Sequence, residues 1–472
     1  MTHITLFPDQ SDIVARVQKT MPRYKSILLQ SATGSGKTRI AVHMMDRIRL
    51  KGNRVGFVVP RRELLKQTIE TVEGFGVPYG VIAAGYKPNP FANVHLMTSG
   101  TLARRLDIAP KLQVVFIDEC HYGGAELDRI IRHYQAQGAW VIGLSATPMK
   151  TNGQGMGEWY DVMIEGPSIR WFMDNRRLSE YMLFAPDTPD LSALRVSNGD
   201  YLAKDVDSYM MSEERGKVLV GNAARHYRDH ASGLRNVVFC TSIRHAEMTS
   251  AMFNDSGVPT TFVHGKLDDA EISRRVISFA RGDVHCLCNV DLLTFGFDLS
   301  QAANMDVTVE ALSDLRPTKS LPLQLQKWGR ALRMKDRPAV IFDHAGNSAP
   351  DLHGLPDSDR EWTLDARDKR KRGDAEKTEP TRQCTECWFV HRPAPCCPNC
   401  GFEYPVIGRS VDEVEGDLVL VTDAAPKVNK KQEVGIIARR EGLTGLLEYA
   451  KQNGHKPQWA AMQLRTRGLP VR

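Results

Sequence analysis

The sequence predicts an α/β protein with two parallel sheets, each with helices on both faces, followed by a small cysteine module and a basic helical tail. Residues 26–147 and 206–345 alternate short apolar runs with stretches of helical periodicity. This alternation is typical of parallel strands joined by covering helices. Two cysteine pairs at metal-ligand spacing follow. We expect a first α/β domain at 1–152, a connector at 153–205, a second α/β domain at 206–350, a charged linker at 351–380, a cysteine module at 381–405 and a basic tail at 425–472.

The first α/β domain contains five apolar runs that we expect to be strands, at 26–30, 54–59, 94–98, 113–117 and 140–144. Amphipathic helical patterns lie between several of them, including 63–72 and 126–137. Scattered glycines and prolines in 150–205 predict an irregular connector with one helix near 168–175.

The second α/β domain repeats this pattern. Its expected strands are 236–240, 260–263, 284–289, 305–310 and 339–342, and its expected helices are 213–230, 244–255, 268–281 and 321–333. Residues 359–380 are dense in charge and include a basic run at 369–372. That run is either part of a solvated linker or a contact for phosphate groups.

The composition is ordinary for a soluble globular protein, with 42% hydrophobic and 25% charged residues. A net charge of +6 permits a polyanionic partner without demonstrating one. The first ten residues lack the basic and apolar pattern of a signal peptide, and no apolar run reaches the length of a membrane span. We therefore expect a cytoplasmic protein, in a bacterial or phage-infected cell, with no membrane partner.

A glycine-rich loop, Ala-Thr-Gly-Ser-Gly-Lys-Thr at 32–38, lies between the first strand and a helical stretch. That context is the one a phosphate-binding loop requires, because backbone N–H groups and the helix N-terminus both attract phosphate. Lys37 is expected to reach the β- and γ-phosphates, and the Thr38 hydroxyl to ligate Mg²⁺. The strict pattern has glycine at Ser31, so an ordinary turn is the alternative. The loop residues expected to contact the nucleotide are Thr33, Gly34, Ser35, Gly36, Lys37 and Thr38.

Two carboxylates, Asp118 and Glu119, end the apolar run that precedes them, in the sequence Asp-Glu-Cys-His. An aspartate at a strand end beside a phosphate loop is the Walker-B arrangement, which holds Mg²⁺. The adjacent glutamate can then orient and deprotonate the attacking water. Asp-Glu alone would be a weak signal, and its combination with the loop makes it strong.

Two further sequence blocks are weak alone. Ser-Ala-Thr-Pro at 145–148 is a turn signal, because proline breaks a strand. Gln-Lys-Trp-Gly-Arg-Ala-Leu-Arg at 326–333 places Arg330 and Arg333 on one face of an expected helix. Such a pair is either solvated surface or a set of arginine fingers that reach a γ-phosphate.

In this order the four blocks resemble the superfamily 2 helicases and translocases. Within them the chain looks like the Asp-Glu-x-His group of type III restriction motor subunits, XPB-like and UvsW-like enzymes. Five secondary blocks, at 59–67, 97–102, 239–246, 293–298 and 316–320, look like motifs Ia, Ib, IV, V and the segment before motif VI. Gln10 stands where the family has an adenine-reading glutamine. The resemblance covers about residues 1–345.

The resemblance implies two RecA-like domains with ATP in the cleft between them. It assigns catalysis to Lys37, Asp118, Glu119, Gln326, Arg330 and Arg333, and adds Gln10 and Asp298 to the nucleotide contacts of the loop. It makes Thr38 and Asp118 the Mg²⁺ ligands. The residues that couple the ATP site to the domain interface and to nucleic acid are His121, Ser145 and Thr147.

The resemblance also implies that nucleic acid crosses both domains and is held through its phosphates. Our candidates for these contacts are Arg62, Thr98, Thr241 and Thr294. Each of them could instead serve as plain surface or as a helix cap.

The cysteine module contains Cys384-x₂-Cys387 and Cys397-x₂-Cys400. Four thiolates at this spacing predict a tetrahedral structural Zn²⁺ site, a zinc ribbon, with reduced free cysteines as the alternative. Cys396 is a possible substitute ligand. Three residues of the module, Trp388, Phe389 and His391, either stack on a base or cover the small core of the ribbon.

Within the basic tail, the segment from 442 to 470 looks like the C-terminal helical piece of phage and prophage helicases. Gly454 suits a helix C-terminus, and a second helix is expected to open at Trp459.

We therefore expect an ATP-dependent DNA helicase or translocase with ATP, Mg²⁺ and Zn²⁺ as cofactors, acting in replication, recombination or repair. Single-stranded, duplex or branched DNA is the expected partner. The Asp-Glu-Cys-His subgroup favours DNA over RNA. The alternatives are a motor subunit of a restriction-like complex, an RNA helicase, or a non-translocating scaffold switched by ATP. Protein partners could bind the ribbon or the tail.

Overall fold

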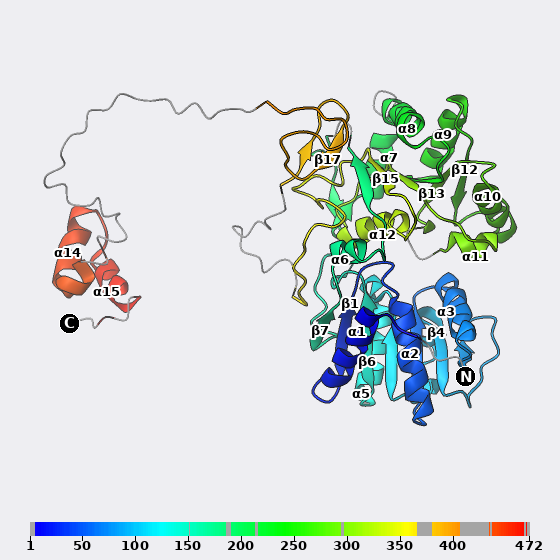
Figure 1. Ribbon diagram of the computed structural model, residues 1–472. Coiled ribbons are helices and arrows are strands. Elements are labelled where there is room, and N and C mark those ends of the chain that lie inside the picture. Colours follow the sequence, from blue (N-terminus) through cyan, green and yellow to red (C-terminus); the bar gives the residue numbers. More distant parts are fainter. Residues whose placement is uncertain are drawn as a thin grey trace. The chain divides into compact units, whose positions relative to one another are not determined.

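The computed structural model describes residues 5–150, 152–185, 190–212, 216–293, 297–365, 380–405, 434, 437–466 and 469, except for the side chains of residues 216–219 (Figure 1). The chain divides into two compact units, Met1–Tyr404 and Pro405–Arg472. The basic run at 369–372 and the site candidate Thr294 lie outside the described residues. Among the helices that are described, none is long and apolar enough to cross a membrane.

The first sheet has seven strands, all parallel, in the order β3-β4-β2-β5-β6-β1-β7. The five predicted strands are confirmed to within one residue at each end. The strands are β1 (Ser26–Gln30), β2 (Val55–Val59), β3 (Gly80–Ile82), β4 (Val94–Thr98), β5 (Val114–Ile117), β6 (Trp140–Ser145) and β7 (Val162–Glu165). The sequence missed β3 and β7, which are short and lie at the two edges of the sheet.

Strand residues alternate between two apolar layers, as the two-residue repeat of a strand requires. Leu29 packs with α1 (Pro8–Thr20), α2 (Lys37–Leu50) and α3 (Arg62–Gly74) on one face. Leu28 packs with α4 (Ser99–Leu102) and α5 (Ala125–Ala136) on the other. Short 3₁₀ turns lie at Leu106–Ile108 and Cys120–Tyr122. Burying one such side chain stabilises the fold by about 1.5–3 kcal/mol.

The second sheet has eight strands in the order β12-β13-β11-β14-β15-β8-β17-β16. The first six are parallel, and β17 and β16 run antiparallel at one edge. The strands are β8 (Tyr181–Phe184), β11 (Asn236–Phe239), β12 (Thr260–His264), β13 (Cys286–Val290), β14 (Ala311–Asp314), β15 (Ala339–Asp343), β16 (Arg382–Gln383) and β17 (Phe389–His391). A separate hairpin joins β9 (Val196–Ser197) and β10 (Asp200–Tyr201).

Helices cover both faces of this sheet as well. One apolar layer includes α6 (Ile169–Asp174), α10 (Asp269–Arg281), α11 (Leu299–Ala303) and α12 (Leu321–Ala331). The opposite layer includes α7 (Ala203–Met210), α8 (Gly216–Ala231) and α9 (Ile243–Asp255). The two sheets with their helices confirm the predicted α/β class, in the tandem arrangement of RecA-like domains.

Three expectations need correction. The strand predicted at 305–310 is wrong, because Val307 and Val309 are buried in the core while the backbone joins β11 only from Ala311. The predicted helix at 321–333 ends at Ala331, so Arg333 lies beyond it. Residues 153–205 are more than a connector with one helix, because β7 completes the first sheet and β8 lies inside the second.

The cysteine module predicted at 381–405 is joined to the second sheet. Its strand β17 pairs with β8, matching Phe389 to Phe184 and Val390 to Leu183. The module therefore extends the second sheet.

The second compact unit contains two helices, α14 (Gly442–Gln452) and α15 (Pro457–Arg465). They pack around Leu446, Ala460 and Leu464. Trp459 stacks on His455 with ring centroids 4.5 Å apart. Gly454 has a φ of 72°, which confirms the predicted helix end, and α15 begins two residues earlier than predicted.

Candidate active site

The glycine-rich loop runs from β1 into α2 and turns through left-handed backbone at two glycines. Gly34 has a φ of 85° and Gly36 a φ of 87°. The φ of Gly36 strains any residue with a side chain, and a Cβ there would also lie 2.5 Å from Gln10 Nε2, so the position favours glycine. The loop leads directly into the N-terminus of α2, where the helix dipole favours binding of an anion.

Lys37 is the first residue of α2 and is buried. Its Nζ donates to Ser31 O at 3.0 Å and to Ala32 O at 3.2 Å, so the ammonium group lies folded over its own loop. Gln10 supports the same loop from α1, because its Nε2 donates to Ser35 O at 3.0 Å. The loop thus carries a buried positive charge at the helix N-terminus.

Asp118 and Glu119 follow β5 beside this loop. Burial, and next the neighbouring Glu119, raise the pKa of the Asp118 carboxyl group to about 7, while Lys37 opposes the rise. Glu119 has a φ of 46°, an unusual value for a residue with a side chain, and it turns the chain into the 3₁₀ turn at Cys120–Tyr122. A divalent metal ion bound beside Asp118 would favour the charged carboxylate that burial disfavours.

His121 connects the first domain to the second. Its Nδ1 lies 3.0 Å from Ser145 Oγ, and its Nε2 lies 3.1 Å from Gln326 Nε2 of α12. Burial lowers the pKa of His121, so the ring is neutral and its Nε2 can accept from the Gln326 amide. Tyr122 also donates its hydroxyl proton to Gln326 Oε1.

Ser145, the last residue of β6, continues this chain of contacts. Its Oγ donates to Thr147 O at 2.5 Å, which leaves its lone pairs to accept from His121 Nδ1–H. The chain of contacts from Thr147 through Ser145 and His121 therefore reaches Gln326, so the structure brings all four predicted residues together.

The predicted arginines lie at the end of α12. Arg333 donates to Asp298 Oδ2 at 3.2 and 3.3 Å, and Asp298 caps α11 by accepting from Ser300 N at 2.8 Å. Burial, and next Arg333, lower the pKa of Arg330 to about 10, so it stays charged at neutral pH. Asp298 is thus paired with Arg333 inside the second domain.

The helix α12, which carries Arg330, lies against the glycine-rich loop. A Cβ at Gly329 would lie 2.7 Å from Thr33 Cγ2, so a side chain there would separate the two. Ala32 is buried in the same apolar layer as Leu325 and Trp328 of α12. The loop and the arginine helix are therefore in direct contact.

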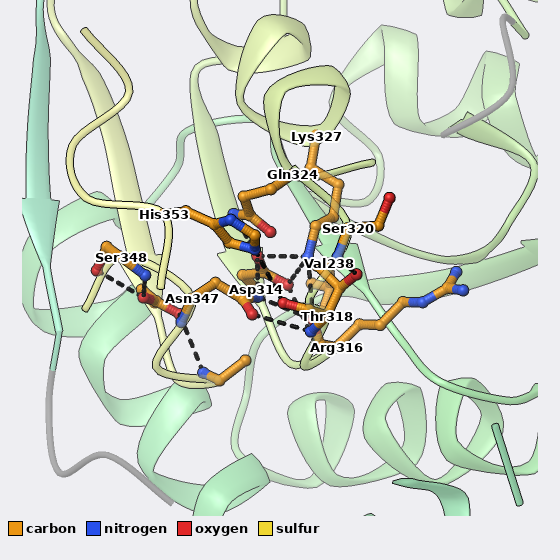
Figure 2. Close-up of polar contacts among 12 residues, drawn as sticks. Val238, Asp314, Arg316, Thr318, Ser320, Gln324, Lys327, Asn347, Ser348 and His353 are labelled. Carbon is orange, nitrogen blue, oxygen red and sulfur yellow. Dashed lines mark hydrogen bonds and ion pairs between the residues drawn. The ribbon is translucent and has the colours of Figure 1, made fainter. Parts of the chain in front are cut away.

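A buried polar network holds α12 to the second sheet (Figure 2). Lys327 Nζ donates to both carboxylate oxygens of Asp314 at 2.7 Å, and both side chains are fully buried. Gln324 and Asn347 each donate to Asp314 Oδ2 at 3.0 Å. The network anchors the middle of α12 to the end of β14. Its lysine, Lys327, lies one residue after Gln326 and three before Arg330. Sequence reasoning missed the network, although a lysine among the apolar residues of α12 is a usable signal.

Breaking this pair is expected to destabilise the second domain strongly. Lys327→Met leaves Asp314 buried without its countercharge, which costs about 3–5 kcal/mol of unfolding free energy. Urea denaturation measures this loss. Arg337→Ala removes an exposed ion pair to Glu310 (3.5 Å) and serves as the control, with an expected cost below about 1 kcal/mol. Equal losses in the two variants would contradict the account.

The candidates for nucleic-acid contact lie near the ends of strands. Thr98 ends β4, and its Oγ1 donates to Thr101 Oγ1 at 3.0 Å. Arg62 is the exposed first residue of α3, and Thr241 follows β11 with its Oγ1 3.0 Å from His245 Nδ1. These three lie at or beyond the carboxyl ends of parallel strands.

The four predicted cysteine ligands form one cluster, with their sulfur atoms all within 4.8 Å of one another. Cys384 and Cys400 have sulfurs 3.6 Å apart, as do Cys387 and Cys397. Tetrahedral zinc with bonds of about 2.3 Å places its sulfurs about 3.8 Å apart, so the donor set fits that ion. Cys396 is exposed and lies outside the cluster.

The aromatic residues of the module divide between the two predicted roles. Phe389 packs against the core of the second sheet, and His391 is buried with its Nε2 2.7 Å from Tyr404 Oη. Trp388 is 37% exposed, so its side chain remains accessible to a partner.

A buried carboxylate, Asp357, ties the module to the connector. It accepts from Arg392 and Arg170 at 3.3 Å each, and from the Tyr181 hydroxyl group. These partners belong to the cysteine module, α6 and β8. The module is thus anchored through side chains as well as through the sheet.

Comparisons with known proteins find matches to both α/β domains. The family model of the type III restriction enzyme res subunit matches residues 3–150, and that of the helicase conserved C-terminal domain matches residues 217–335. A 51.5 kDa protein of Lactococcus phage (isolate 7-9) is 30% identical over 383 residues, 80% of this chain and 78% of that protein.

Two further relatives are longer proteins. The putative ATP-dependent helicase IRC3 of Saccharomyces cerevisiae is 26% identical, and the alignment covers 75% of this chain and 54% of that protein. The type I restriction enzyme EcoKI endonuclease subunit of Escherichia coli (strain K12) is also 26% identical, over 71% of this chain and 33% of that protein. The chain therefore spans about half the length of the yeast helicase and a third of the length of the EcoKI subunit.

Proposed function

This chain belongs to the superfamily 2 helicases, and we propose that it is a DNA motor that couples ATP hydrolysis to movement along DNA or to DNA remodelling. Membership makes it an ATP hydrolase that uses Mg²⁺ and binds nucleic acid. Replication, recombination and repair are the processes that such a motor serves. The phage relative favours the cytoplasm of a bacterial or phage-infected cell as its place of action.

The observation that carries the motor proposal is the contact between the two halves of the site. Gln326 bonds His121 across the domains, and Gly329 lies against Thr33 of the loop. Because catalytic groups come from both sheets, hydrolysis requires the domains to be closed, and product release lets them open. Each turnover would thus move one domain against the other.

The loop residues are proposed to hold the triphosphate, with Lys37 at the β- and γ-phosphates. Thr38 and Asp118 would ligate Mg²⁺, which neutralises phosphate charge when bound. The position of the buried Asp118 directly after β5, with Lys37 of the loop nearby, supports this role. Glu119 is proposed to orient and deprotonate the attacking water.

The arginines complete the proposed mechanism from the second domain. Arg330 would stabilise the charge that develops on the transferred phosphoryl group. Arg333, held by Asp298, would take its place beside it. Positioning and charge stabilisation are thus the main contributions of the protein.

DNA is proposed to run across the carboxyl edges of both sheets, held by Arg62, Thr98, Thr241 and Thr294. Contacts to phosphates are independent of base sequence and weaken as salt rises. The Asp-Glu-Cys-His sequence and the relative that is a restriction-enzyme endonuclease subunit both favour DNA over RNA.

We also propose that the cysteine cluster holds Zn²⁺ and braces the second domain. The sulfur spacing and the pairing of β17 with β8 support this role. Protein partners that bind the ribbon or the C-terminal unit remain a prediction.

Strand displacement tests motor action against the rival scaffold. A forked DNA duplex with a fluorophore and a quencher on opposite strands is mixed with protein and ATP. We expect displacement by the wild type and none by Lys37→Ala, although both bind the fork. A wild type that hydrolyses ATP and binds the fork, yet displaces neither this strand nor a triplex-forming third strand, would establish the scaffold instead.

A further inference from the structure

A β-hairpin of the connector, formed by β9 and β10, turns at two residues with left-handed backbone. Asn198 has a φ of 50° and Gly199 a φ of 81°, the pattern of a two-residue hairpin turn. A Cβ at Gly199 would lie 3.0 Å from both the carbonyl carbon and the carbonyl oxygen of Asn152. In the first domain, Asn152 follows β6 and the predicted coupling residues Ser145 and Thr147. The tip of the hairpin therefore touches the first domain.

The second strand of the hairpin is fixed to the second domain through Asp200. Its Oδ2 accepts from Thr318 Oγ1 at 2.8 Å, and its Oδ1 accepts from Lys319 N at 2.7 Å. Thr318 is fully buried and belongs to the polar network that holds α12, because its N–H donates to Asn347 Oδ1 at 2.9 Å (Figure 2). Lys319 Nζ also lies 5.0 Å from the centre of the Tyr201 ring, within the range of a cation–π contact. These contacts join the hairpin to the loop between β14 and α12.

This loop leads directly into the helix that carries Gln326 and Arg330. The Thr318 hydroxyl group donates to Asp200 and accepts from Ser320 N at 3.0 Å. Ser320 is the N-cap residue of α12, and its own side chain makes no capping hydrogen bond. Asp200 therefore orients the hydroxyl group that holds the start of α12.

We propose that Asp200 is a positioning residue for ATP hydrolysis, and that the hairpin of β9 and β10 is a second link between the two halves of the site. This inference rests on the proposed motor function. When the domains are closed, the Asn152 loop supports the hairpin tip, and Asp200 transmits that support to the start of α12. The link is separate from the contact between His121 and Gln326, which lies in the middle of the same helix. Loss of the link would displace Arg330 from the phosphate, which lowers kcat rather than ATP binding.

Steady-state ATPase assays at saturating DNA compare Asp200→Ala and Gly199→Asn with the wild type. Asp200→Ala removes hydrogen bonds to a carboxylate, so kcat is expected to fall about tenfold while the KM for ATP stays within about twofold of the wild-type value. Gly199→Asn keeps left-handed backbone, which asparagine tolerates, but its Cβ pushes the hairpin tip away from Asn152. This variant is expected to lower kcat to a similar extent.

Two further changes serve as matched controls. Asn198→Gly alters the same turn without adding a side chain, and Asp229→Ala removes an exposed carboxylate from α8 of the same domain. Both are expected to keep the wild-type kcat. Thermal melting checks that all four variants are folded.

A double variant with Asp200→Ala and Gly199→Asn distinguishes one shared link from two separate effects. If both residues act through the hairpin, the double variant loses no more kcat than the worse single variant, whereas independent losses multiply to about a hundredfold. Multiplied losses, an unchanged kcat in folded Asp200→Ala, or a KM that rises as kcat falls would each overturn the proposal.

Gly199→Asn alters only the exposed tip, so an unchanged kcat in that variant overturns the proposal even if Asp200→Ala does not fold. A wild-type protein whose ATPase activity is not stimulated by nucleic acid would instead refute the proposed function, so the two failures are distinguishable.

Discussion

Arg330→Ala is expected to lower the DNA-stimulated kcat by about 10³- to 10⁵-fold, with little change in the KM for ATP. An arginine finger acts on charge that develops only in the transition state, so its loss affects kcat rather than ground-state binding. Arg330 is charged at neutral pH, and its electrostatic interaction with Glu119 places it near that carboxylate of the first domain.

The control for Arg330 is Arg337→Ala, an arginine of the same domain that is exposed and pairs with Glu310. It is expected to keep wild-type kcat. Thermal melting of both variants checks that they fold. If folded Arg330→Ala protein retains more than about a tenth of wild-type kcat, Arg330 is not an arginine finger.

Removal of zinc is expected to lower the stability of the protein strongly. A ligand present at a thousand times its Kd stabilises the folded state by about 4 kcal/mol. For a domain of this size, that corresponds to a fall of about 8–16 °C in melting temperature. Cys384→Ser protein, or wild-type protein treated with a chelator, should show this fall in calorimetry.

The neighbouring cysteines give this experiment a matched control. Cys396→Ser changes an exposed thiol outside the cluster, so it should keep one zinc per chain and the wild-type melting temperature. The pairing of β17 with β8 also predicts that Cys384→Ser lowers ATPase activity measured without nucleic acid. If the ribbon served only to bind DNA, the variant would keep the basal ATPase rate of the wild type. If metal analysis found no zinc in the wild-type protein, the assignment of the four cysteines as a zinc site would be wrong.

Sequence patterns predicted most of the first sheet because its central strands are buried on both faces and read as continuous apolar runs. The edge strand β7 was missed since two of its residues are half-buried, one is exposed and the surrounding sequence is rich in glycine. The strand at 305–310 was misplaced because Val307 and Val309 are buried without pairing in the sheet.

Contacts between residues far apart in sequence could not be predicted from local patterns. The Lys327–Asp314 pair joins two buried charges 13 residues apart, and Arg177 meets Asp9 across 168 residues. The resemblance to a known family did assign His121 and Gln326 to the same ATP site, because family knowledge carries long-range information that local patterns lack, and the structure places them in contact.

The central claim, a motor driven by ATP on DNA, is tested most directly by ATPase stimulation. Purified protein is assayed with single-stranded DNA, duplex DNA, forked DNA and RNA at equal nucleotide concentration, with Lys37→Ala as the inactive control. The account predicts strong stimulation by at least one form of DNA, which weakens as salt rises, and a basal rate with RNA. Stimulation by RNA equal to that by DNA, or none by any nucleic acid, would contradict it.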